Sequence, residues 1–409
     1  MTQLEKLITE HCPNGVEYVP LGDFCDLVRG SGLPKSDFTD SGVGCIHYGQ
    51  IYTYYGIFTE NTKSFVSSET AKSLKKVQTG DLIVASTSEN YEDVCKSVAW
   101  LGTDEIVTGG HATIIKHKQN PKYLSYCFTT QEFFKQKRKY AKGTKVIDVS
   151  AKDLAKISVP LPPIPIQRKI VEILDNFTEL TAELTAELTA RKRQYEYYRN
   201  YLLTFDNFDS TILTDGRTDG RTDGRTVRWM KLSDICNISR GRVMSKGYLR
   251  DNVGKYPVYS SQTANQGVFG YINSYDYDCE SITWTTDGAN AGSVFYHNDK
   301  KFSITNVCGL LRSDRKDIVL KYLFYALQVN TKQYVNYGMG NPKLMSNVMG
   351  AIIIPVPPLE EQARIVEILD KFDALTSDLT QGLPAEIAVR QKQYEYYRDK
   401  LLAFEEKTA

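Results

Sequence analysis

A dense group of basic residues lies between positions 135 and 145, in the segment KQKRKYAKGTK. The segment has no acidic residue, and Tyr140 stands among its cations. Its six cationic residues are Lys135, Lys137, Arg138, Lys139, Lys142 and Lys145. Such a pattern, at a helix end and the loop after it, suits contacts with the phosphate groups of a nucleic acid. A solvated helix face is the alternative.

Polar residues in the same part of the chain could read base edges. The candidates are Ser86, Ser88, Asn90, Thr108 and His111. Their side chains offer the donors and acceptors that sequence readout in a DNA groove requires. His111 could equally be a structural histidine whose hydrogen bonds are satisfied within the fold.

A second group of candidates follows in SSQTANQG, from Ser260, and TWTTDGANAG, from Thr283. Asn and Gln can bind adenine with two hydrogen bonds, and Arg or Lys can bind guanine or phosphate. The amide candidates are Gln262, Asn265 and Asn290, and the cationic ones are Arg240, Arg242 and Lys343. Ordinary hairpin turns, which also favour Asn and Gly, are the alternative explanation.

The sequence lacks the patterns that would indicate catalysis by this chain. Its eight cysteines include no CxxC pair, so neither zinc ligation nor a disulfide framework is expected. There is no phosphate-binding loop of the GxxxxGK[ST] kind. The segment NPKL at Asn341 lacks the second proline and the aromatic residue of an adenine methyltransferase pocket. We therefore expect a non-catalytic protein without a metal site.

Length and charge set the broad class. The chain has 409 residues, enough for two or three domains, and its 50 basic residues nearly balance 49 acidic ones. Overall charge therefore indicates no particular partner, and any DNA binding must come from local basic patches. The first residues contain no hydrophobic signal segment, and no apolar run reaches membrane-spanning length. We expect a soluble, cytoplasmic protein.

Two repeated stretches must position these candidates. IVEILDNF begins at Ile170 and IVEILDKF at Ile365, whereas QYEYYR occurs at Gln194 and again at Gln393. The apolar residues of the first copy follow steps of three and four, and TELTAELTAELTA contains neither Gly nor Pro. This pattern predicts a coiled-coil helix of about 40 residues, roughly 60 Å long.

The second copy predicts a less regular helix, because Gly382 and Pro384 interrupt it. We expect a kink or break there, with Pro384 restarting the helix. Two helices that each have one apolar seam are expected to pack antiparallel against each other. Packing of each helix on an unrelated surface is the alternative, but it leaves the repeat of the flanking segments unexplained.

A globular segment precedes each long helix, and the edges of the two segments match. VEYVPLGDFCDLVRG, from Val16, resembles VRWMKLSDICNISRG, from Val227. Short β-type runs in each segment precede one probable helix, YLSYCFTTQEFFKQKRKY or YLFYALQVNTKQYV. The expected class is α+β: two α/β domains joined by two long antiparallel coiled-coil helices with pseudo-twofold symmetry. The expected boundaries are domain 1–163, helix 164–205, mobile tether with TDGR repeats 206–226, domain 227–358, helix 359–404 and tail 405–409.

The duplicated domains, IVEILDxF and QYEYYR together resemble the specificity subunit of type I restriction-modification systems, in the branch with TAEL repeats in its central helix. The resemblance covers the chain apart from the TDGR segment. It implies that each domain reads one half of a bipartite DNA target and that the coiled coil sets the half-site spacing. It also implies two modification subunits, docked on the coiled coil, that bring S-adenosylmethionine and methylate adenine. Motor subunits would bring ATP and Mg²⁺, and this chain would bind no cofactor. A coiled-coil scaffold without DNA readout is the alternative.

Overall fold

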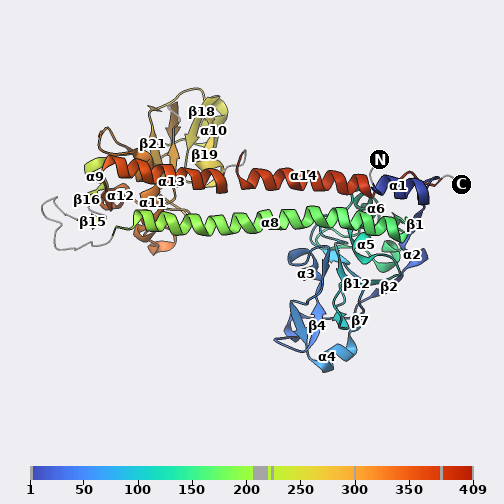
Figure 1. Ribbon diagram of the computed structural model, residues 1–409. Helices are drawn as coiled ribbons and strands as arrows, with labels where there is room; N and C mark the ends of the chain where they lie inside the picture. Colours follow the sequence, from blue (N-terminus) through green and yellow to red (C-terminus); the bar gives the residue numbers. More distant parts are fainter. Residues whose placement is uncertain (1–2, 206–219, 223–224, 299–300, 378–380, 408–409) are drawn as a thin grey trace. The chain divides into compact units, whose positions relative to one another are not determined.

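The computed structural model describes residues 3–205, 220–222, 225–298, 301–377 and 381–407. The chain divides into two compact units, Met1–Thr185 with Ile387–Ala409, and Ala186–Glu386. Each unit contains one globular domain and parts of the long helices (Figure 1). The unit boundaries cross the helices α8 (Ile164–Leu203) and α14 (Leu383–Leu401), so these helices belong to both units.

The first unit has two five-stranded sheets. One has the order β2-β12-β8-β10-β5, with bounds Asp26–Arg29, Ala112–Lys116, Leu82–Ala85, Ser97–Trp100 and Phe58–Thr59. The other has the order β3-β6-β4-β11-β7, with bounds Phe38–Thr39, Ser64–Val66, Val43–Ile46, Ile106–Thr108 and Lys75–Val77. Every residue of β8 is buried, which explains why its sequence, LIVA, is apolar throughout rather than alternating.

Short strands and helices surround these sheets. Two pairs of strands are β1 (Tyr18–Pro20) with β14 (Ser158–Pro160), and β9 (Thr87–Ser88) with β13 (Ile147–Asp148). The helices are α1 (Gln3–His11), α2 (Leu21–Phe24), the 3-10 helix Lys35–Asp37, α3 (Tyr48–Thr53), α4 (Ser68–Ser73), α5 (Pro121–Cys127), α6 (Gln131–Tyr140) and α7 (Ala151–Leu154). The main core of the unit joins residues of the first sheet to α5 and to the start of α8.

The second unit has two four-stranded sheets. One has the order β17-β24-β21-β22, with bounds Asn237–Arg240, Cys308–Arg312, Ser281–Thr285 and Val294–His297. The other has the order β19-β18-β23-β20, with bounds Val268–Ile272, Val253–Tyr259, Lys301–Ile304 and Tyr277–Asp278. A three-stranded sheet contains β15 (Gly220–Thr222), β16 (Arg225–Lys231) and β25 (Ile353–Val356). The helices are α9 (Leu232–Ile235), α10 (Lys246–Asp251), α11 (Leu320–Asn330), α12 (Ser346–Ala351) and α13 (Leu359–Ser377), with 3-10 helices at Ala264–Gly267, Thr331–Tyr334 and Gly338–Gly340.

The two globular domains share one strand arrangement. The order β2-β12-β8-β10 in the first domain corresponds to β17-β24-β21-β22 in the second. In the other sheet, the parallel pair β4 and β11 corresponds to the parallel pair β18 and β23. The match supports the internal duplication that the repeated edges predicted, and the predicted α+β class is confirmed.

The long helices pair antiparallel within each unit. In the first, Phe177 of α8 stacks on Tyr397 of α14, with ring centroids 5.4 Å apart. In the second, Tyr198 of α8 stacks on Phe372 of α13 at 5.7 Å, and Leu203 lies in one cluster with Ile365. Residue numbers rise along α8 as they fall along the partner helix, as expected for an antiparallel coiled coil (Figure 1).

Equivalent ion pairs attach each domain to its long helix. In the first unit, Tyr126 Oη and Lys122 Nζ donate to the two carboxylate oxygens of Asp175, each at 2.8 Å. The equivalent donors and acceptor in the second unit are Tyr325, Lys321 and Asp370. In both units the paired groups join the helix that follows the sheets to the IVEILD segment. The repeat therefore preserves the attachment of the domains as well as the helices.

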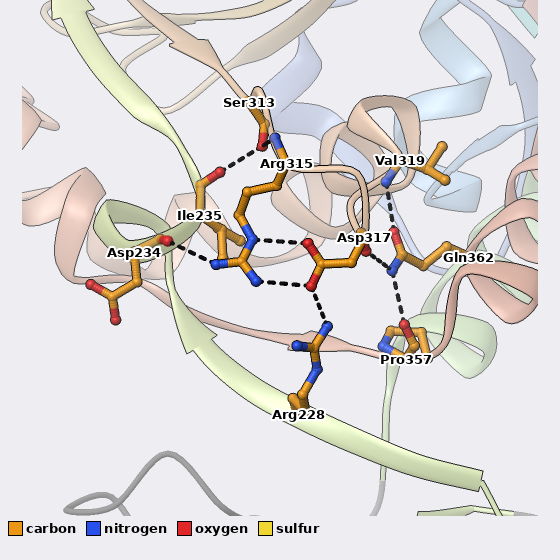
Figure 2. Close-up of polar contacts among 9 residues, drawn as sticks. All are labelled: Arg228, Asp234, Ile235, Ser313, Arg315, Asp317, Val319, Pro357 and Gln362. Carbon is orange, nitrogen blue, oxygen red and sulfur yellow. Dashed lines mark hydrogen bonds and ion pairs between the residues drawn. The ribbon is translucent and has the colours of Figure 1, made fainter.

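A buried glutamine makes the next contact in each unit. Gln362 Nε2 donates to the carbonyl oxygens of Pro357, at 2.8 Å, and Asp317, at 2.9 Å, whereas its Oε1 accepts from the backbone of Val319 (Figure 2). Gln167 makes the equivalent contacts at the start of α8. The prolines that precede the helix thus supply a carbonyl group as well as a stiff turn.

The second unit adds an arginine cluster at this joint. The Asp317 carboxylate accepts two hydrogen bonds from Arg315, at 2.9 and 2.8 Å, and one from Arg228, at 2.7 Å (Figure 2). Hydrogen bonds from Arg315 and then from Arg228 hold the pKa of the Asp317 carboxyl group well below its ordinary range. The cluster connects β16 to the loop that leads into α11.

The two ends of the first unit are also joined. The backbone of Val16 accepts from Lys407 at 3.1 Å and donates to Glu405 at 2.8 Å. Gly15 has a φ of +90°, and a Cβ atom there would lie 2.5 Å from the Glu405 carbonyl oxygen. Only glycine fits this close approach without strain.

Two predicted elements are corrected. The segment 123–140 is two helices rather than one, because Thr130 has extended backbone angles and its side chain caps α6 by accepting from Phe133. Within the predicted tether, β15 and the start of β16 form an antiparallel pair, so these residues have strand conformation. Positions 206–219 and 223–224 of that tether lie outside the described residues.

The predicted interruption of the second long helix is confirmed. The helix α13 ends at Ser377 and α14 begins at Leu383, with Pro384 in its first turn. Proline is tolerated there because the first turn of a helix has no internal acceptor for its N–H groups. By contrast, α8 continues for 40 residues without a break, as its sequence predicted.

Candidate nucleic-acid interface

An Arg-Gly pair ends the first strand of each large sheet. Arg29 ends β2 and Arg240 ends β17, and each keeps part of its side chain exposed. The following glycines allow a second segment to approach closely: a Cβ atom at Gly30 would lie 2.0 Å from the Gly109 carbonyl oxygen. A Cβ atom at Gly241 would lie 2.0 Å from the carbonyl oxygen of Ile304, at the end of the neighbouring strand β23.

In the first domain, Arg29 is held by a turn and a carboxylate. Its Nε donates to the carbonyl oxygen of Gly110 at 3.2 Å. Its Nη2 lies 3.7 Å from Oδ2 of Asp148. Asp148 belongs to β13, whose backbone pairs with Thr87 of β9.

In the second domain, Arg240 is held in the same manner. Its Nη2 donates to the carbonyl oxygen of Asn306 at 2.6 Å and to Thr286 Oγ1 at 3.0 Å. The same nitrogen lies 3.5 Å from Oδ2 of Asp287. Lys343 Nζ approaches the other oxygen of that carboxylate at 4.0 Å.

Backbone hydrogen bonds show that the two junctions are equivalent. In the first domain, Ser86 N donates to the His111 carbonyl group, and Ser86 O accepts from Val149. In the second, the corresponding bonds of Thr286 join it to the carbonyl group of Val307 and the N–H of Leu344. Each domain thus brings three loops together around its arginine, and the side chains that line the two junctions differ. We call these places the loop junctions.

Three of the predicted base-reading residues in the first domain are corrected, because they are buried. Ser86 Oγ shares a hydrogen bond with Thr113 Oγ1 at 2.8 Å, and Thr108 Oγ1 donates to the Ile46 carbonyl group at 2.7 Å. Ser88 is buried as well. The partners of these hydroxyl groups are Thr113 and backbone groups of the domain, so the three side chains are not accessible to DNA.

Two other candidates in that domain are exposed. His111 lies in the loop junction with its ring centroid 4.9 Å from that of Tyr48 on α3. Asn90 caps a turn, because its Oδ1 accepts from the backbone of Asp93 at 2.7 Å and its Nδ2 donates to the same residue's carboxylate.

The basic segment divides by exposure. Lys137 is corrected as a phosphate contact: it is 4% exposed, and its Nζ donates to the carbonyl oxygens of Val94, at 2.6 Å, and Glu92, at 3.1 Å. Burial lowers the pKa of its ammonium group. The remaining cations, which are exposed, are Lys135, Arg138, Lys139, Lys142 and Lys145.

Two of these exposed cations have carboxylate partners. Lys135 Nζ lies 3.7 Å from Glu132, and Lys142 Nζ lies 3.1 Å from Asp153. Hydrogen bonds from Lys156 and then from Lys142 hold the pKa of the Asp153 carboxyl group below its ordinary range. The charge available for phosphate is therefore concentrated on the other three cations.

The amide candidates of the second domain lie in or beside one loop. Gln262 Nε2 donates to the carbonyl group of Val268, and Asn290 Nδ2 donates to Thr263 Oγ1 at 3.4 Å. Asn265 is exposed and has a φ of 49°, and its neighbour Gln266 has a φ of 53°. Two consecutive non-glycine residues in this conformation are rare and costly, and such strain is often found at functional sites.

A groove of about 1000 Å³ lies beside this loop, lined by Lys255, Tyr256, Pro257, Tyr259, Asn265, Gln266, Val268, Tyr271, Asp278 and Lys301. The last cationic candidate of the second domain, Arg242, does not line this groove: its Nε donates to Asp276 at 3.1 Å and its Nη2 to Tyr248 Oη at 3.2 Å.

Sequence reasoning missed Arg29, Tyr48 and Gln266. Arg29 had a usable signal, because the matched segments end in VRG and SRG and so align it with Arg240. Tyr48 and Gln266 had none, since their positions depend on how the loops fold.

Two other kinds of feature, a metal site and a membrane-spanning helix, are absent from the residues that the structure describes. No group of three or more His, Cys, Asp or Glu side chains there could hold a metal ion. Within the same residues, no helix combines the length and apolar character that a membrane crossing requires.

Comparisons with known proteins agree with this architecture. The family model described as the type I restriction modification DNA specificity domain matches residues 13–191 and 225–389. A putative type I specificity subunit of Mycoplasma pneumoniae is 41% identical over 62% of this chain and 99% of its own length. A putative type I restriction enzyme specificity subunit of Haemophilus influenzae is 30% identical over 98% of both chains.

Solved structures show the same fold at low identity. The S subunit of a type I restriction-modification system from M. genitalium matches 95% of this chain with a TM-score of 0.56 and 16% identity. A chain from a structure on complex assembly and conformational transition of the type I R-M system matches 95% with a TM-score of 0.59 and 18% identity.

Proposed function

This chain belongs to the family of type I restriction-modification DNA specificity proteins, and we propose on that basis that it is the non-catalytic DNA-specificity subunit of a type I restriction-modification complex. Each globular domain reads one half of a bipartite DNA target. The antiparallel helices hold the two domains at a set spacing, so the gap between the half-sites is fixed by helix length.

One observation carries this proposal: the two domains have the same strand order and the same loop junction, lined by different side chains. A protein that reads one asymmetric target needs a repeated frame with two different reading surfaces. A scaffold without DNA readout would not require the loops of two equivalent domains to differ. Phosphate contacts fix the register of a protein on DNA, whereas loop side chains select the sequence.

The long helices supply the docking surface for partner subunits. Tyr197 and Tyr201 on α8 are 65% and 66% exposed, and Tyr396 on α14 is 61% exposed. Exposed tyrosines provide contact area with little loss of side-chain freedom and are enriched at protein interfaces. Since QYEYYR occurs once in each half of the chain, we propose that two copies of a modification subunit bind, one at each occurrence, and that motor subunits bind through them.

The chemistry belongs to those partners in this proposal. Modification subunits bring S-adenosylmethionine and methylate adenine, and motor subunits bring ATP and Mg²⁺. The complex works in the cytoplasm, where its DNA target and these cofactors are found together.

A DNA-binding assay on the assembled complex tests the proposal. The chain is purified with its modification subunits, and binding to genomic fragments is measured by filter retention or gel shift against random-sequence competitor DNA. We expect a subset of fragments to bind at least 10³-fold more tightly than competitor, as for sequence-specific proteins. A complex that assembles but binds all fragments equally would instead indicate a scaffold without DNA readout.

A further inference from the structure

We propose that Arg29 and Arg240 are equivalent base-reading residues, each contacting a guanine in the half-site of its own domain. The inference rests on the proposed function and adds specific residues to it. It also assigns Asp148 and Asp287 as positioning residues that orient the two guanidinium groups.

Position within the duplicated fold is the first argument. Each arginine is the last residue of an edge strand, β2 or β17, in the four-strand order that the two domains share. Each precedes a glycine whose missing side chain lets the neighbouring segment approach. Both donate to a carbonyl group in the equivalent turn, at Gly110 and Asn306. Because the loops around them differ in sequence, retention of this arrangement in both domains points to a shared role.

Geometry is the second argument. The arginine side chains remain 50% and 33% exposed despite their contacts. Arg29 uses Nε and Nη2, whereas Arg240 uses Nη2 alone, so Nη1 of each has no partner among the residues that the structure describes. Guanine presents two adjacent acceptors, O6 and N7, to an arginine in the major groove. The Nη1 group of each arginine can donate to one of them, and a second hydrogen bond requires Nη2 to exchange one of its present contacts for the base.

The carboxylates explain how these long side chains are kept ready to bind. Asp148 and Asp287 lie 3.7 and 3.5 Å from the guanidinium nitrogens, at the edge of contact range. Exposed ion pairs of this kind contribute little to folding stability. They do restrict the side chain to fewer rotamers, and a side chain fixed before binding loses less entropy on contact with DNA.

The residues around the two arginines differ, which explains how equivalent arginines can serve two different half-site sequences. In the first domain, His111 and Tyr48 lie in or beside the loop junction. In the second, Lys343 approaches the carboxylate of Asp287. The base pairs next to each guanine therefore meet different donors and acceptors, so the two half-sites differ in sequence.

The test uses the complete complex with modification subunits, after its target has been mapped from methylated adenines. Arg29→Gln and Arg240→Gln are compared with the unchanged chain on a duplex carrying the target and on duplexes with one base pair changed. We expect Arg29→Gln to remove about 10- to 100-fold of discrimination at one guanine of one half-site and to leave the other half-site unchanged. Arg240→Gln should do the same in the other half-site.

Two further variants separate base reading from other roles. Arg29→Lys keeps the positive charge but loses the planar fork, so it should restore little discrimination. Asp148→Asn should weaken discrimination at the same guanine as Arg29→Gln, by a smaller factor. Arg250→Gln is the matched control, because Arg250 is exposed on α10 and, among the described residues, forms its one ion pair with its neighbour Asp251. It should leave both half-sites unchanged.

Three results would overturn the inference. One is equal loss of binding to target and random DNA, restored by Arg29→Lys, which would show a phosphate contact. Another is an unchanged recognition sequence in both glutamine variants. The third is a fall in melting temperature with loss of both half-sites, which would show a structural ion pair. If the unchanged complex selects no sequence, the proposed function itself fails, and this outcome is distinct from the other three.

Discussion

The ammonium group of Lys137 illustrates how burial gives one lysine of a basic segment a different role from its exposed neighbours. Its contacts with two backbone carbonyl groups compensate for the loss of water, so it contributes to folding rather than to DNA binding. Arg138, Lys139 and Lys145, in the same short segment, are exposed and have no carboxylate within ion-pair distance among the described residues. They therefore remain the best candidates for phosphate contacts.

A salt titration tests this division. Arg138→Ala, Lys139→Ala and Lys145→Ala together should weaken binding to target and random DNA alike. Each lost phosphate contact should reduce the slope of log K against log salt concentration by about 0.9. Lys137→Ala should instead lower the melting temperature, because it removes the donor to the buried Val94 carbonyl group and to the partly buried Glu92 carbonyl group. A triple variant with an altered recognition sequence and an unchanged slope would contradict the phosphate role.

Burial of a histidine in the first domain predicts that the stability of the protein depends on pH. His117 Nδ1 accepts from the backbone of Gln119 at 3.1 Å, and its buried Nε2 has no partner among the described residues. Burial lowers its pKa to about 4, below the ordinary value of about 6.5. Between these two values the unfolded chain binds a proton and the folded chain does not, so stability is full above about pH 6.5 and falls as the pH drops toward 4.

Thermal unfolding at several pH values tests this prediction. Between pH 7 and pH 5 the first unit should lose roughly 2 kcal/mol through His117 alone. His117→Asn keeps an acceptor for Gln119 but does not titrate, so its stability should fall less over the same interval. Parallel curves for the two proteins would show that the histidine is solvated.

At the scale of single residues, the sequence shows which side chains could bind DNA but not which of them are exposed. Exposed His111 and buried Thr108 were equal candidates, because residue type and turn composition do not reveal which face of a strand carries a side chain in a diverged domain. Arg29 could have been found from the aligned VRG and SRG segments. The strained pair Asn265 and Gln266 could not, since its conformation follows from how the loop closes on Val268.

Helices were the most predictable elements of the chain. The absence of Gly and Pro between Phe177 and Arg191 predicted an unbroken α8, and Gly382 and Pro384 predicted the gap between α13 and α14. The division between α5 and α6 was missed because the apolar residues continue through it. The Thr130 cap that causes it is a local side-chain choice that periodicity does not detect.

The TAEL repeat of α8 makes a prediction about helix length. Insertion of one TAEL unit after Leu188 adds four residues, or about 6 Å of helix. Since base pairs are spaced by about 3.4 Å, the gap between the half-sites should widen by one or two base pairs, with both half-sites unchanged. Mapping of methylated sites in cells with the insertion measures this gap. An unchanged gap would show that helix length does not set the spacing.

Across the whole molecule, the duplication is the feature that connects sequence, fold and function. The repeated segments predicted two domains, and the matching strand orders, equivalent glutamine contacts and equivalent loop junctions follow the same repeat. The base sequence that the domains select is a property of the diverged loops, which no pattern in the chain specifies. Family membership and fold agree with a protein that holds two different reading surfaces on one repeated frame.

Genome-wide mapping of methylated adenines, in cells with and without this gene, tests that view most directly. We predict one bipartite sequence, with two unlike blocks of specified bases separated by a gap of fixed length, that loses methylation when the gene is removed. Methylation of a single uninterrupted sequence, or a methylation pattern that does not depend on the gene, would contradict the account.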